Sequence, residues 1–447
     1  MKPDKYQQIA IETNKNTLLI AGAGCGKTFT IVEKIKYLIN NNICKPEEIL
    51  ILSFTNKSVN DLKTKITFPC HILTFHKLAI LLLEKMNLEF QVVQDSYLLE
   101  IIDLYFFNLT ETPLKEEILT YFSFYNYQKF LNSKMYQQFK DLIFKTIKFI
   151  KTNNISKNQF LTLLKKDFFL AKFIYTIKCF YEQELKKQSA FDFDDLIINA
   201  TNLTNKPSNL KYIIIDEFQD TSLIRFNLIN KLRIINKATL FCVGDDYQSI
   251  YHFSGCNLNI FLNFQKLIPN AQILKLHTTY RNSQELINIS TKFIMKNQAQ
   301  IAKNLYSHKT LKRPIEFIYY INPRKALQKV LNKLDNNYLI LGRNNFDIGY
   351  FTKEKVNFLT IHSAKGLEAE NVIIINLTNK TYGLPNKSTN HLFLNILHPE
   401  DNSYLYAEER RLFYVALTRS KNKVYLLVPI FKPSIFIKEL KKIIKSS

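Results

Sequence analysis

The sequence contains no tryptophan, few glycines and no long apolar run. Its longest apolar runs, such as Leu78 to Leu83, fall far short of the roughly 18 residues that a transmembrane helix needs. The first residues, Met1 to Asp4, lack the apolar stretch of a secretion signal. We therefore expect no membrane insertion and a cytoplasmic location. The 46% of hydrophobic residues is ample for packed cores and excludes a disordered or collagen-like chain.

Cysteine is sparse, and no two cysteines have the spacing of a metal-binding pair. The six cysteines contain no Cys-x-x-Cys pair, so neither a zinc ribbon nor an iron–sulfur cluster is indicated. We expect them to be reduced thiols in packed cores.

Arginine is scarce although the chain is strongly basic. The net charge is +23, but it comes from 52 lysines and only nine arginines. The abundance of Lys, Ile, Asn, Phe and Tyr is typical of a gene biased toward A and T, so charge alone is weak evidence for nucleic-acid binding. The placement of the arginines is more informative: none precedes Arg225, and four lie in two short segments, at Arg281, Arg410, Arg411 and Arg419.

Short apolar runs alternate with helical patterns along most of the chain. At roughly 100 to 200 residues per domain, 447 residues predict two to four domains. Continuous apolar strands between helices indicate parallel sheets that are covered on both faces. A first series of strands is predicted at Thr17–Ile20, Ile49–Phe54, His71–Phe75, Tyr212–Ile215 and Thr239–Val243. A second series is predicted at Ile273–Leu276, Ile315–Tyr320, Tyr338–Leu341, Phe358–Ile361, Val372–Ile375 and Val424–Val428.

A long stretch between about Glu84 and Ser189 has a helical period and almost no turn residues. We interpret it as an all-helical insertion into the first of two α/β domains. The expected division is 1–85 for the first part of domain one, 86–188 for the insertion, 189–278 for the second part of domain one, and 279–447 for domain two.

Three of the nine glycines gather in one turn between a predicted strand and helix. The segment from Ala21 to Thr28, AGAGCGKT, fits a phosphate-binding loop with alanine in place of the first glycine. Glycines let successive N–H groups face phosphates, Lys27 would reach the outer phosphates, and Thr28 would hold Mg²⁺. The predicted nucleotide-binding residues here are Ala21, Gly22, Ala23, Gly24, Cys25, Gly26, Lys27, Thr28 and Phe29.

Two acidic residues follow the predicted strand at Tyr212–Ile215. Asp216 is placed to hold Mg²⁺ together with Thr28, and Glu217 to polarise an attacking water. Acidic residues often end strands without a catalytic role, but the phosphate-binding loop favours catalysis. ATP and Mg²⁺ are therefore the expected ligands.

Eight further short segments have the composition of known motifs. They begin at Phe54 (FTNK), Thr74 (TFH), Asp192 (DFDDL), Asp216 (DEFQDT), Val243 (VGDDYQSIY), Tyr280 (YRNS), Thr360 (TIHSAKGLE) and Glu408 (EERRLFYVALTR). In this combination they resemble the motifs of the UvrD/Rep/PcrA helicases of superfamily 1A, and the resemblance runs from Gln7 to Arg419. It implies two RecA-like P-loop domains with parallel sheets and an all-helical insertion in the first.

The resemblance also implies roles at the nucleotide. Gln7 is similar to the glutamine that reads adenine, Tyr280 to the aromatic that stacks on it, and Glu368 to a glutamate that contacts the ribose. Arg281 and Arg419 resemble two arginines that stabilise the transferring phosphate, and Gln248 a residue that senses the γ-phosphate. The predicted catalytic set is Lys27, Glu217, Gln248, Arg281 and Arg419.

The predicted strand contacts are mostly aromatic or small polar side chains. Stacking on aromatics holds single strands without reading their sequence. The family commonly has tryptophan and then arginine where this chain has Phe253 and Ser254, so binding of the DNA strand at this position is expected to be weaker. For each histidine, a packed structural role is the alternative. The predicted DNA contacts are Phe54, Thr55, Asn56, Thr74, His76, Tyr251, Phe253 and His362.

Well-known members carry a large accessory domain, 2B, between the Tyr-Arg motif and the motif that begins at Thr360. Here only residues 282–359 intervene, and we place the missing insertion near Asp347 to Lys355. We also expect no nuclease domain, and only a short basic tail from Lys432 to Ser447.

The leading interpretation is an ATP-dependent single-stranded-DNA translocase and 3′–5′ DNA helicase that acts as a monomer on single-stranded and 3′-tailed duplex DNA, in DNA repair, replication or recombination. An alternative is the motor or sensor subunit of a nuclease-containing complex, such as a Gabija-type antiphage system, with a nuclease or repair protein as its partner. A DNA-binding scaffold with an inactive ATPase site is less favoured, because the catalytic set is intact.

Overall fold

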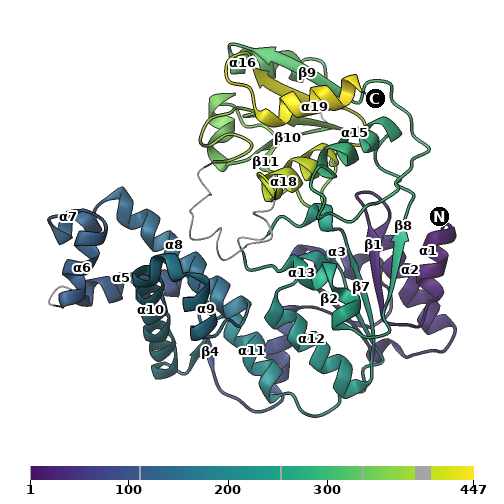
Figure 1. The fold of residues 1–447 in the computed structure, drawn as a ribbon. Coiled ribbons are helices and arrows are strands. Elements are labelled where there is room, and N and C mark those ends of the chain that lie inside the picture. Colours follow the sequence, from purple (N-terminus) through teal and green to yellow (C-terminus); the bar gives the residue numbers. More distant parts are fainter. Residues whose placement is uncertain (1, 110–111, 252–253, 335–336, 388–403, 447) are drawn as a thin grey trace.

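The chain folds around two parallel β-sheets, which confirms the predicted α/β class (Figure 1). The computed structural model describes residues 2–109, 112–251, 254–334, 337–387 and 404–446. In this part of the chain, every predicted strand is present and ends within one residue of its expected bounds. The strands Thr17–Ala21, Ile49–Ser53 and Tyr212–Ile215 are buried at every residue, which explains why their apolar runs were readable.

The first sheet has six strands in the order β3-β2-β6-β7-β1-β8. All neighbouring strands pair in parallel. Leu18 and Ile20 of β1 face one hydrophobic core and Leu19 and Ala21 face the other, so helices are packed on both faces. The strands are β1 (Thr17–Ala21), β2 (Ile49–Ser53), β3 (His71–Thr74), β6 (Tyr212–Ile215), β7 (Thr239–Gly244) and β8 (Gln272–Leu276).

The helices of this first part divide between the two faces. One face is covered by α1 (Lys5–Glu12), α2 (Lys27–Asn40) and α3 (Asn56–Lys65). The other is covered by α4 (Phe75–Glu84), α11 (Phe193–Leu203), α12 (Leu223–Asn236), α13 (Leu258–Leu262) and α14 (Phe264–Leu267).

The strand at Ile273–Leu276 corrects one expectation. The list of strands counted it with the second series, although the expected division kept residues 189–278 in domain one. In the structure, β8 pairs with β1 at the edge of the first sheet, from Thr17↔Gln272 to Ala21↔Leu276. An apolar run shows that a strand exists but not which neighbour it pairs with.

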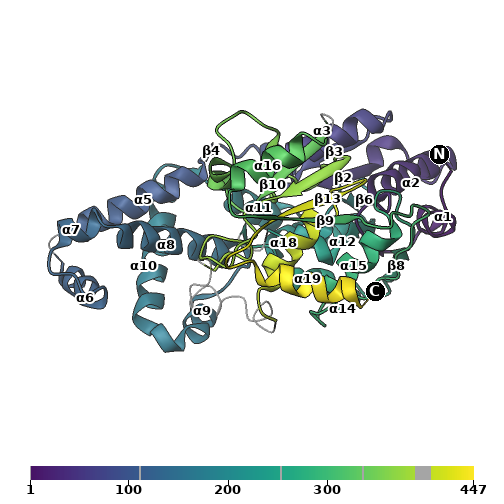
Figure 2. The same ribbon diagram turned by 90° about the horizontal axis from the view of Figure 1, so that it is seen from above.

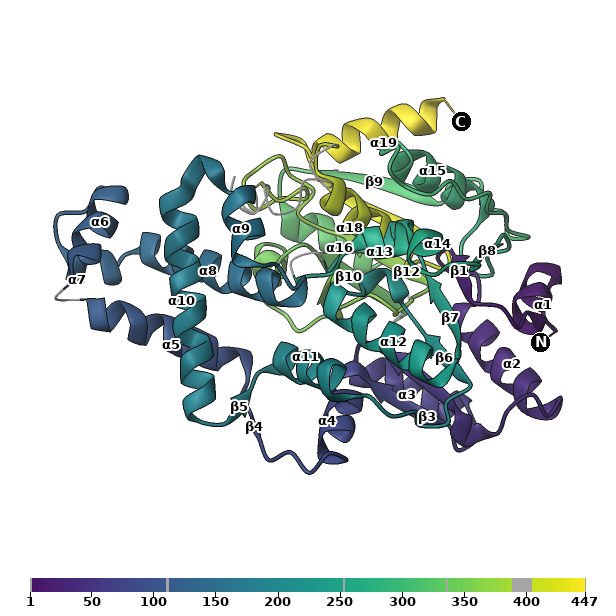
Figure 3. The same cartoon turned by 60° about the horizontal axis from the view of Figure 1, so that its bottom comes forward.

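The predicted helical stretch extends sideways from the first sheet (Figure 2). Its core is rich in aromatic contacts: Phe106 lies 5.0 Å from Tyr136 and 5.6 Å from Phe173 between ring centroids. A two-stranded parallel pair, β4 (Gln91–Val92) with β5 (Ala190–Phe191), closes its base beside α11 (Figure 3). The helices are α5 (Asp95–Asn108), α6 (Pro113–Tyr121), α7 (Tyr127–Leu131), α8 (Lys134–Thr152), α9 (Lys157–Leu163) and α10 (Phe168–Lys187).

The second sheet has five parallel strands in the order β11-β10-β12-β13-β9. One face packs on α15 (Gln284–Ile294), α18 (Ala407–Leu417) and α19 (Ile435–Lys445), and the other on α16 (Pro323–Leu331). The strands are β9 (Ile315–Tyr320), β10 (Tyr338–Gly342), β11 (Phe358–Thr360), β12 (Asn371–Ile374) and β13 (Val424–Pro429).

The expected basic tail is largely a packed helix. In α19, Phe436, Ile437, Leu440 and Ile443 are buried against the second sheet, while the lysines of this helix are exposed. The expectation of a tail was wrong because the apolar spacing of 3.6 residues was overlooked among the lysines.

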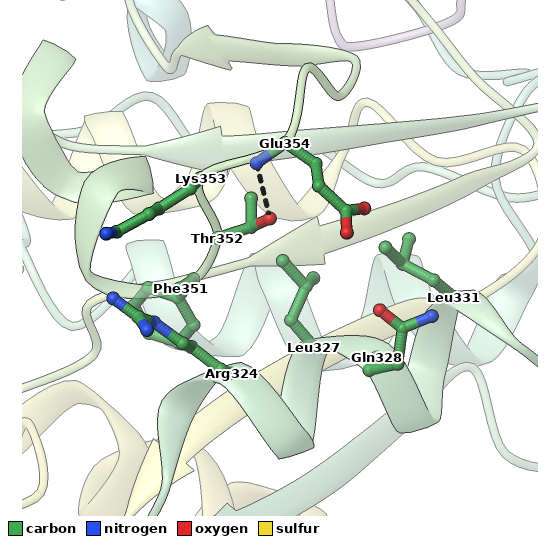
Figure 4. Close-up of a pocket in the computed structure, with 8 residues that line it drawn as sticks. All are labelled: Arg324, Leu327, Gln328, Leu331, Phe351, Thr352, Lys353 and Glu354. Atoms are coloured by element: carbon green, nitrogen blue, oxygen red, sulfur yellow. Dashed lines mark hydrogen bonds between the residues drawn. The ribbon is translucent and has the colours of Figure 1, made fainter.

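The segment near the expected deletion point is a short 3-10 helix, Asn345–Tyr350, followed by a loop. A cavity of about 250 Å³ lies between this loop and α16, lined by Arg324, Leu327, Gln328, Leu331, Phe351, Thr352, Lys353 and Glu354 (Figure 4). None of these residues is a predicted ATP or DNA contact.

The six cysteines form no disulfide, and four of them are buried. In the described ranges, no helix combines the length and the apolarity that crossing a bilayer requires.

Candidate functional site

The glycine turn between β1 and α2 has the backbone that its sequence requires. Gly24 and Gly26 have φ of 73° and 80°, a left-handed region that favours glycine. Gly26 caps the N-terminus of α2. A Cβ at Gly24 would lie 2.5 Å from the Cβ of Arg281, so the loop also needs glycine for the close approach of a distant segment.

Lys27 and the two acidic residues meet at one edge of the sheet. The Lys27 Nζ lies 2.9 Å from Glu217 Oε1, and Gln219 Nε2 donates to Glu217 Oε2 at 2.6 Å. Burial opposes ionisation of Glu217, but the charges of Lys27 and Lys365 outweigh it and hold its pKa below the usual range. Glu217 is therefore a carboxylate, as a water-activating base must be.

Asp216 is a buried carboxyl group suited to a cation. Its Oδ1 accepts the N–H of Glu217 at 2.9 Å, and no described residue forms an ion pair with it. Burial and the neighbouring charge of Glu217 raise the pKa of Asp216 to about 6. Because Lys27 contacts Glu217, the adjacent Thr28 and Asp216 lie at the same edge of the sheet. These oxygen donors fit Mg²⁺, which keeps several waters and phosphate oxygens among its ligands. No group of three or more His, Cys, Asp or Glu suited to a metal exists among the described residues.

Gln7 and Tyr280 both contact Asp4, next to the glycine turn. Gln7 is buried, and its Nε2 donates to the Cys25 carbonyl at 3.2 Å. The Tyr280 hydroxyl donates to Asp4 Oδ2 at 2.9 Å, and its N–H donates to the Gly24 carbonyl at 3.0 Å. The Tyr280 side chain is 38% exposed, so part of its ring is open for stacking.

The two predicted arginines come from segments that border the second sheet. Arg281 Nε lies 2.8 Å from Glu368 Oε2, and Lys421 also pairs with Glu368 at 2.7 Å. Arg419 is buried, and its Nη2 donates to Gln248 Oε1 at 3.0 Å. Burial and the charge of Arg281 lower the pKa of Arg419 to about 9.

Gln248 connects this arginine to the first sheet. Its Nε2 donates to Asp245 Oδ2 at 2.6 Å. The structure thus brings Arg419 and Gln248 into direct contact, and it places Arg281 against the glycine turn.

Two lysines that the sequence analysis did not single out form ion pairs with acidic residues of this region. Lys303 is buried, forms ion pairs with Asp245 and Asp246, and lies 3.3 Å from the Tyr247 ring centroid. Lys365 pairs with Asp220 and donates to the Gln248 carbonyl at 2.8 Å. Lys365 lies inside a recognised motif, whereas no sequence signal marks Lys303 as the partner of the two acids.

The predicted strand contacts of the first sheet lie at the ends of β2 and β3. Thr55 and Thr74 cap α3 and α4 by accepting backbone N–H bonds at 3.1 and 3.3 Å, and Asn56 is exposed at the start of α3. The Phe54 ring packs 5.1 Å from Phe75. The capping threonines therefore have structural bonds besides any contact with a strand.

His76 and His362 are both held neutral. Burial and the charge of Arg225 lower the pKa of His76 to about 4, and its ring lies 5.0 Å from Phe193. Burial and the charge of Arg343 lower the pKa of His362 to about 3. These values are compatible with the packed alternative for each histidine.

The second group of predicted strand contacts is formed across the two sheets. The Tyr251 hydroxyl donates to the His362 carbonyl at 3.1 Å, and Lys365 lies 4.9 Å above the Tyr251 ring. Ser254 donates its hydroxyl to the Tyr251 carbonyl at 2.7 Å. Phe253 lies outside the described residues.

Comparison with known families identifies the class of protein. Residues 1–269 match the UvrD/REP helicase N-terminal domain, and residues 343–429 match the UvrD-like helicase C-terminal domain. The chain belongs to the UvrD/Rep helicases. This is a family of ATP-hydrolysing DNA helicases, so the two sheets correspond to its two RecA-like domains.

Named relatives cover most of the chain. It is 27% identical to DNA helicase IV of Escherichia coli over 98% of its own length and 70% of that protein. It is 28% identical to the ATP-dependent DNA helicase Rep of Buchnera aphidicola subsp. Schizaphis graminum, over 88% of the chain and 61% of Rep. The ATP-dependent DNA helicase PcrA of Staphylococcus aureus is 25% identical over 73% of the chain and 44% of PcrA. The chain thus spans less than two thirds of the Rep and PcrA proteins.

Proposed function

We propose that this UvrD/Rep-family chain is an ATP-dependent single-stranded-DNA translocase and 3′–5′ DNA helicase. The observation that carries the proposal is a continuous set of contacts between the two candidate sites. Arg419 contacts Gln248, Lys365 contacts the Gln248 carbonyl, and the same Lys365 lies over the Tyr251 ring. A change at the nucleotide can therefore be transmitted to the proposed strand-binding surface.

ATP would bind in the glycine turn with its adenine between Gln7 and Tyr280. Lys27 would exchange its contact with Glu217 for the outer phosphates, which frees Glu217 to polarise the attacking water. Arg281 and Arg419 would then stabilise the charge that develops on the transferring phosphate. Mg²⁺, held by Thr28 and Asp216, would neutralise phosphate charge when bound.

Arg281 and Arg419 come from outside the glycine turn, so hydrolysis would depend on how the two RecA-like domains close. We propose the division 1–85 and 189–278 for the first domain, 86–188 for its insertion, and 279–447 for the second domain without 2B. Alternating grip on stacked bases during closure and opening would move the strand.

The test is strand separation on duplexes with a 3′ or a 5′ tail, with ATP and Mg²⁺. We expect unwinding of the 3′-tailed duplex only, together with ATP hydrolysis that single-stranded DNA stimulates. Lys27→Ala serves as the inactive control. A parent protein that shows no DNA-stimulated hydrolysis would contradict the proposal, and unwinding from the 5′ tail alone would reverse the polarity.

We also propose that one chain suffices for unwinding, because 2B restrains monomers in the family and would be missing here. An unwinding rate that rises with the square of protein concentration would contradict this. The alternative of a motor or sensor subunit beside a nuclease gains no support from the named relatives.

A further inference from the structure

Arg225 is an unusual arginine in this chain. It lies in the first turn of α12, partly buried, with its guanidinium carbon 5.4 Å from the ring centroid of Phe54. Its Nε is buried without a hydrogen-bond partner, and it forms no ion pair or hydrogen bond with any described residue. A charged donor in this position normally has an acceptor.

The other partly or fully buried arginines all have such acceptors. Arg233, on the same helix, donates twice to Asn230 Oδ1 at 3.0 and 2.8 Å. The remaining ones bond as follows: Arg281 to Glu368, Arg343 to Glu409, Arg410 to Glu439, Arg411 to the Ser249 carbonyl, and Arg419 to Gln248. Arg225 is thus the exception in the described part of the chain.

Arg225 lies close to the first group of proposed strand contacts. Phe54 is under its guanidinium, and the charge of Arg225 helps to lower the pKa of His76. The same charge opposes the rise in the thiol pKa of Cys256 that burial and Asp220 cause. Arg225 is therefore also near the segment that follows Tyr251.

We propose that Arg225 binds a backbone phosphate of the single strand. The guanidinium is planar and presents several N–H donors, which suits a phosphate, and the Phe54 ring beneath it fixes its plane. The ligand is the sugar–phosphate backbone, so the contact carries no base specificity. The inference rests on the proposed function, since it assumes that a single strand passes over Phe54.

The experiment measures binding of a fluorescent oligothymidine at several salt concentrations. Each phosphate contact with a single strand contributes about 0.7 to the slope of log K against log salt. We expect Arg225→Gln to lower the slope by about 0.7 and the affinity by about tenfold. Arg225→Lys, which keeps the charge, should restore the slope. Arg233→Gln, on the same helix, should match the parent protein.

The outcomes separate this inference from the proposed function. If the parent protein does not bind the oligonucleotide, the proposed function fails. If the parent binds and Arg225→Gln shows the parent's slope, only the role of Arg225 is overturned. If circular dichroism shows that Arg225→Gln is unfolded, Arg225→Met replaces it, because the methionine side chain still covers Phe54. A salt slope of Arg225→Met equal to that of the parent protein would again refute the contact.

Discussion

Glu217 occupies a left-handed backbone conformation, with φ of 52°, at the second position after β6. This conformation turns its carboxylate toward Lys27 instead of into the core. We predict that Glu217→Gln binds ATP but hydrolyses it about 10² to 10⁴ times more slowly, because an amide cannot accept the proton of the attacking water. Hydrolysis by phosphate release and binding of a fluorescent ATP analogue measure the two effects. Glu33→Gln, on the surface of α2, is the control, and near-parent hydrolysis by Glu217→Gln would remove Glu217 from the catalytic set.

His76 gives the protein a pH dependence of stability. Its pKa is about 4 in the fold, against about 6.5 for a free side chain. Below pH 6.5 the unfolded chain binds a proton that the folded chain does not, so the contribution to stability is complete above pH 6.5 and is lost as the pH falls toward 4. The melting temperature of His76→Asn should therefore decline less than that of the parent over this range. His71→Asn, at an exposed position, should follow the parent; parallel curves for His76→Asn and the parent would contradict the prediction.

At the scale of residues, the sequence showed which side chains belong to the nucleotide site better than it showed which side chains contact one another. Lys27, Thr28, Asp216 and Glu217 were identifiable because a strand, a glycine turn and a helix put fixed residue types at fixed places. The partner of the Asp245–Asp246 pair was not identifiable, since Lys303 lies far along the chain and any of many lysines could have served. Contacts between distant segments depend on how the two sheets meet, which local patterns do not specify.

At the scale of elements, the C-terminus of α8 is bound to the loop that follows Tyr251. Asn153 Nδ2 donates to the Gly255 carbonyl at 3.3 Å, and Asn257 Nδ2 donates to Asn153 Oδ1 at 3.2 Å. Gly255 has φ of 83°, and a Cβ there would lie 2.1 Å from Thr152 Oγ1. The helical insertion is thus anchored beside the proposed strand contacts through a glycine.

We predict that Gly255→Ala lowers the free energy of unfolding by about 1–3 kcal/mol, because the new methyl group would overlap Thr152 and alanine is strained at this positive φ. Urea unfolding measures the change. Gly349→Ala is the matched control, since a Cβ there meets nothing within 4 Å. Equal stability of the two variants would show that α8 moves away from the loop without cost.

Elements were predictable to different degrees. Strands such as β6 were readable because burial on both faces makes them continuous apolar runs. The apolar run of β8 did not show to which sheet this strand belongs, because its pairing with β1 depends on contacts between distant segments; only the expected domain boundary at residue 278 kept it with the first domain. The helix α19 was missed although its apolar spacing was present, and the short pair β4–β5 has only two residues in each strand, too few for a pattern.

At the scale of the whole molecule, the two sheets are joined by polar contacts that converge on Asp220 and Gln248. Lys365, from the second sheet, supplies two of these contacts and also lies over Tyr251. Burial, opposed by Lys365, already raises the pKa of Asp220 to about 6. This arrangement makes one lysine the link among Asp220, Gln248, which is proposed to sense the γ-phosphate, and the proposed strand-binding surface.

We predict that Lys365→Met lowers the stimulation of ATP hydrolysis by single-stranded DNA at least about tenfold, because the movement of one domain no longer reaches Asp220 and Gln248. The ratio of hydrolysis rates with and without DNA measures it. Lys296→Met is the matched control, since Lys296, just after α15, pairs with Glu439 of α19, and Arg410 keeps that glutamate paired. A stimulation ratio in Lys365→Met equal to that of the control would mean that the domains communicate by another route. The contact between Arg419 and Gln248 would then be the next one to remove by mutation.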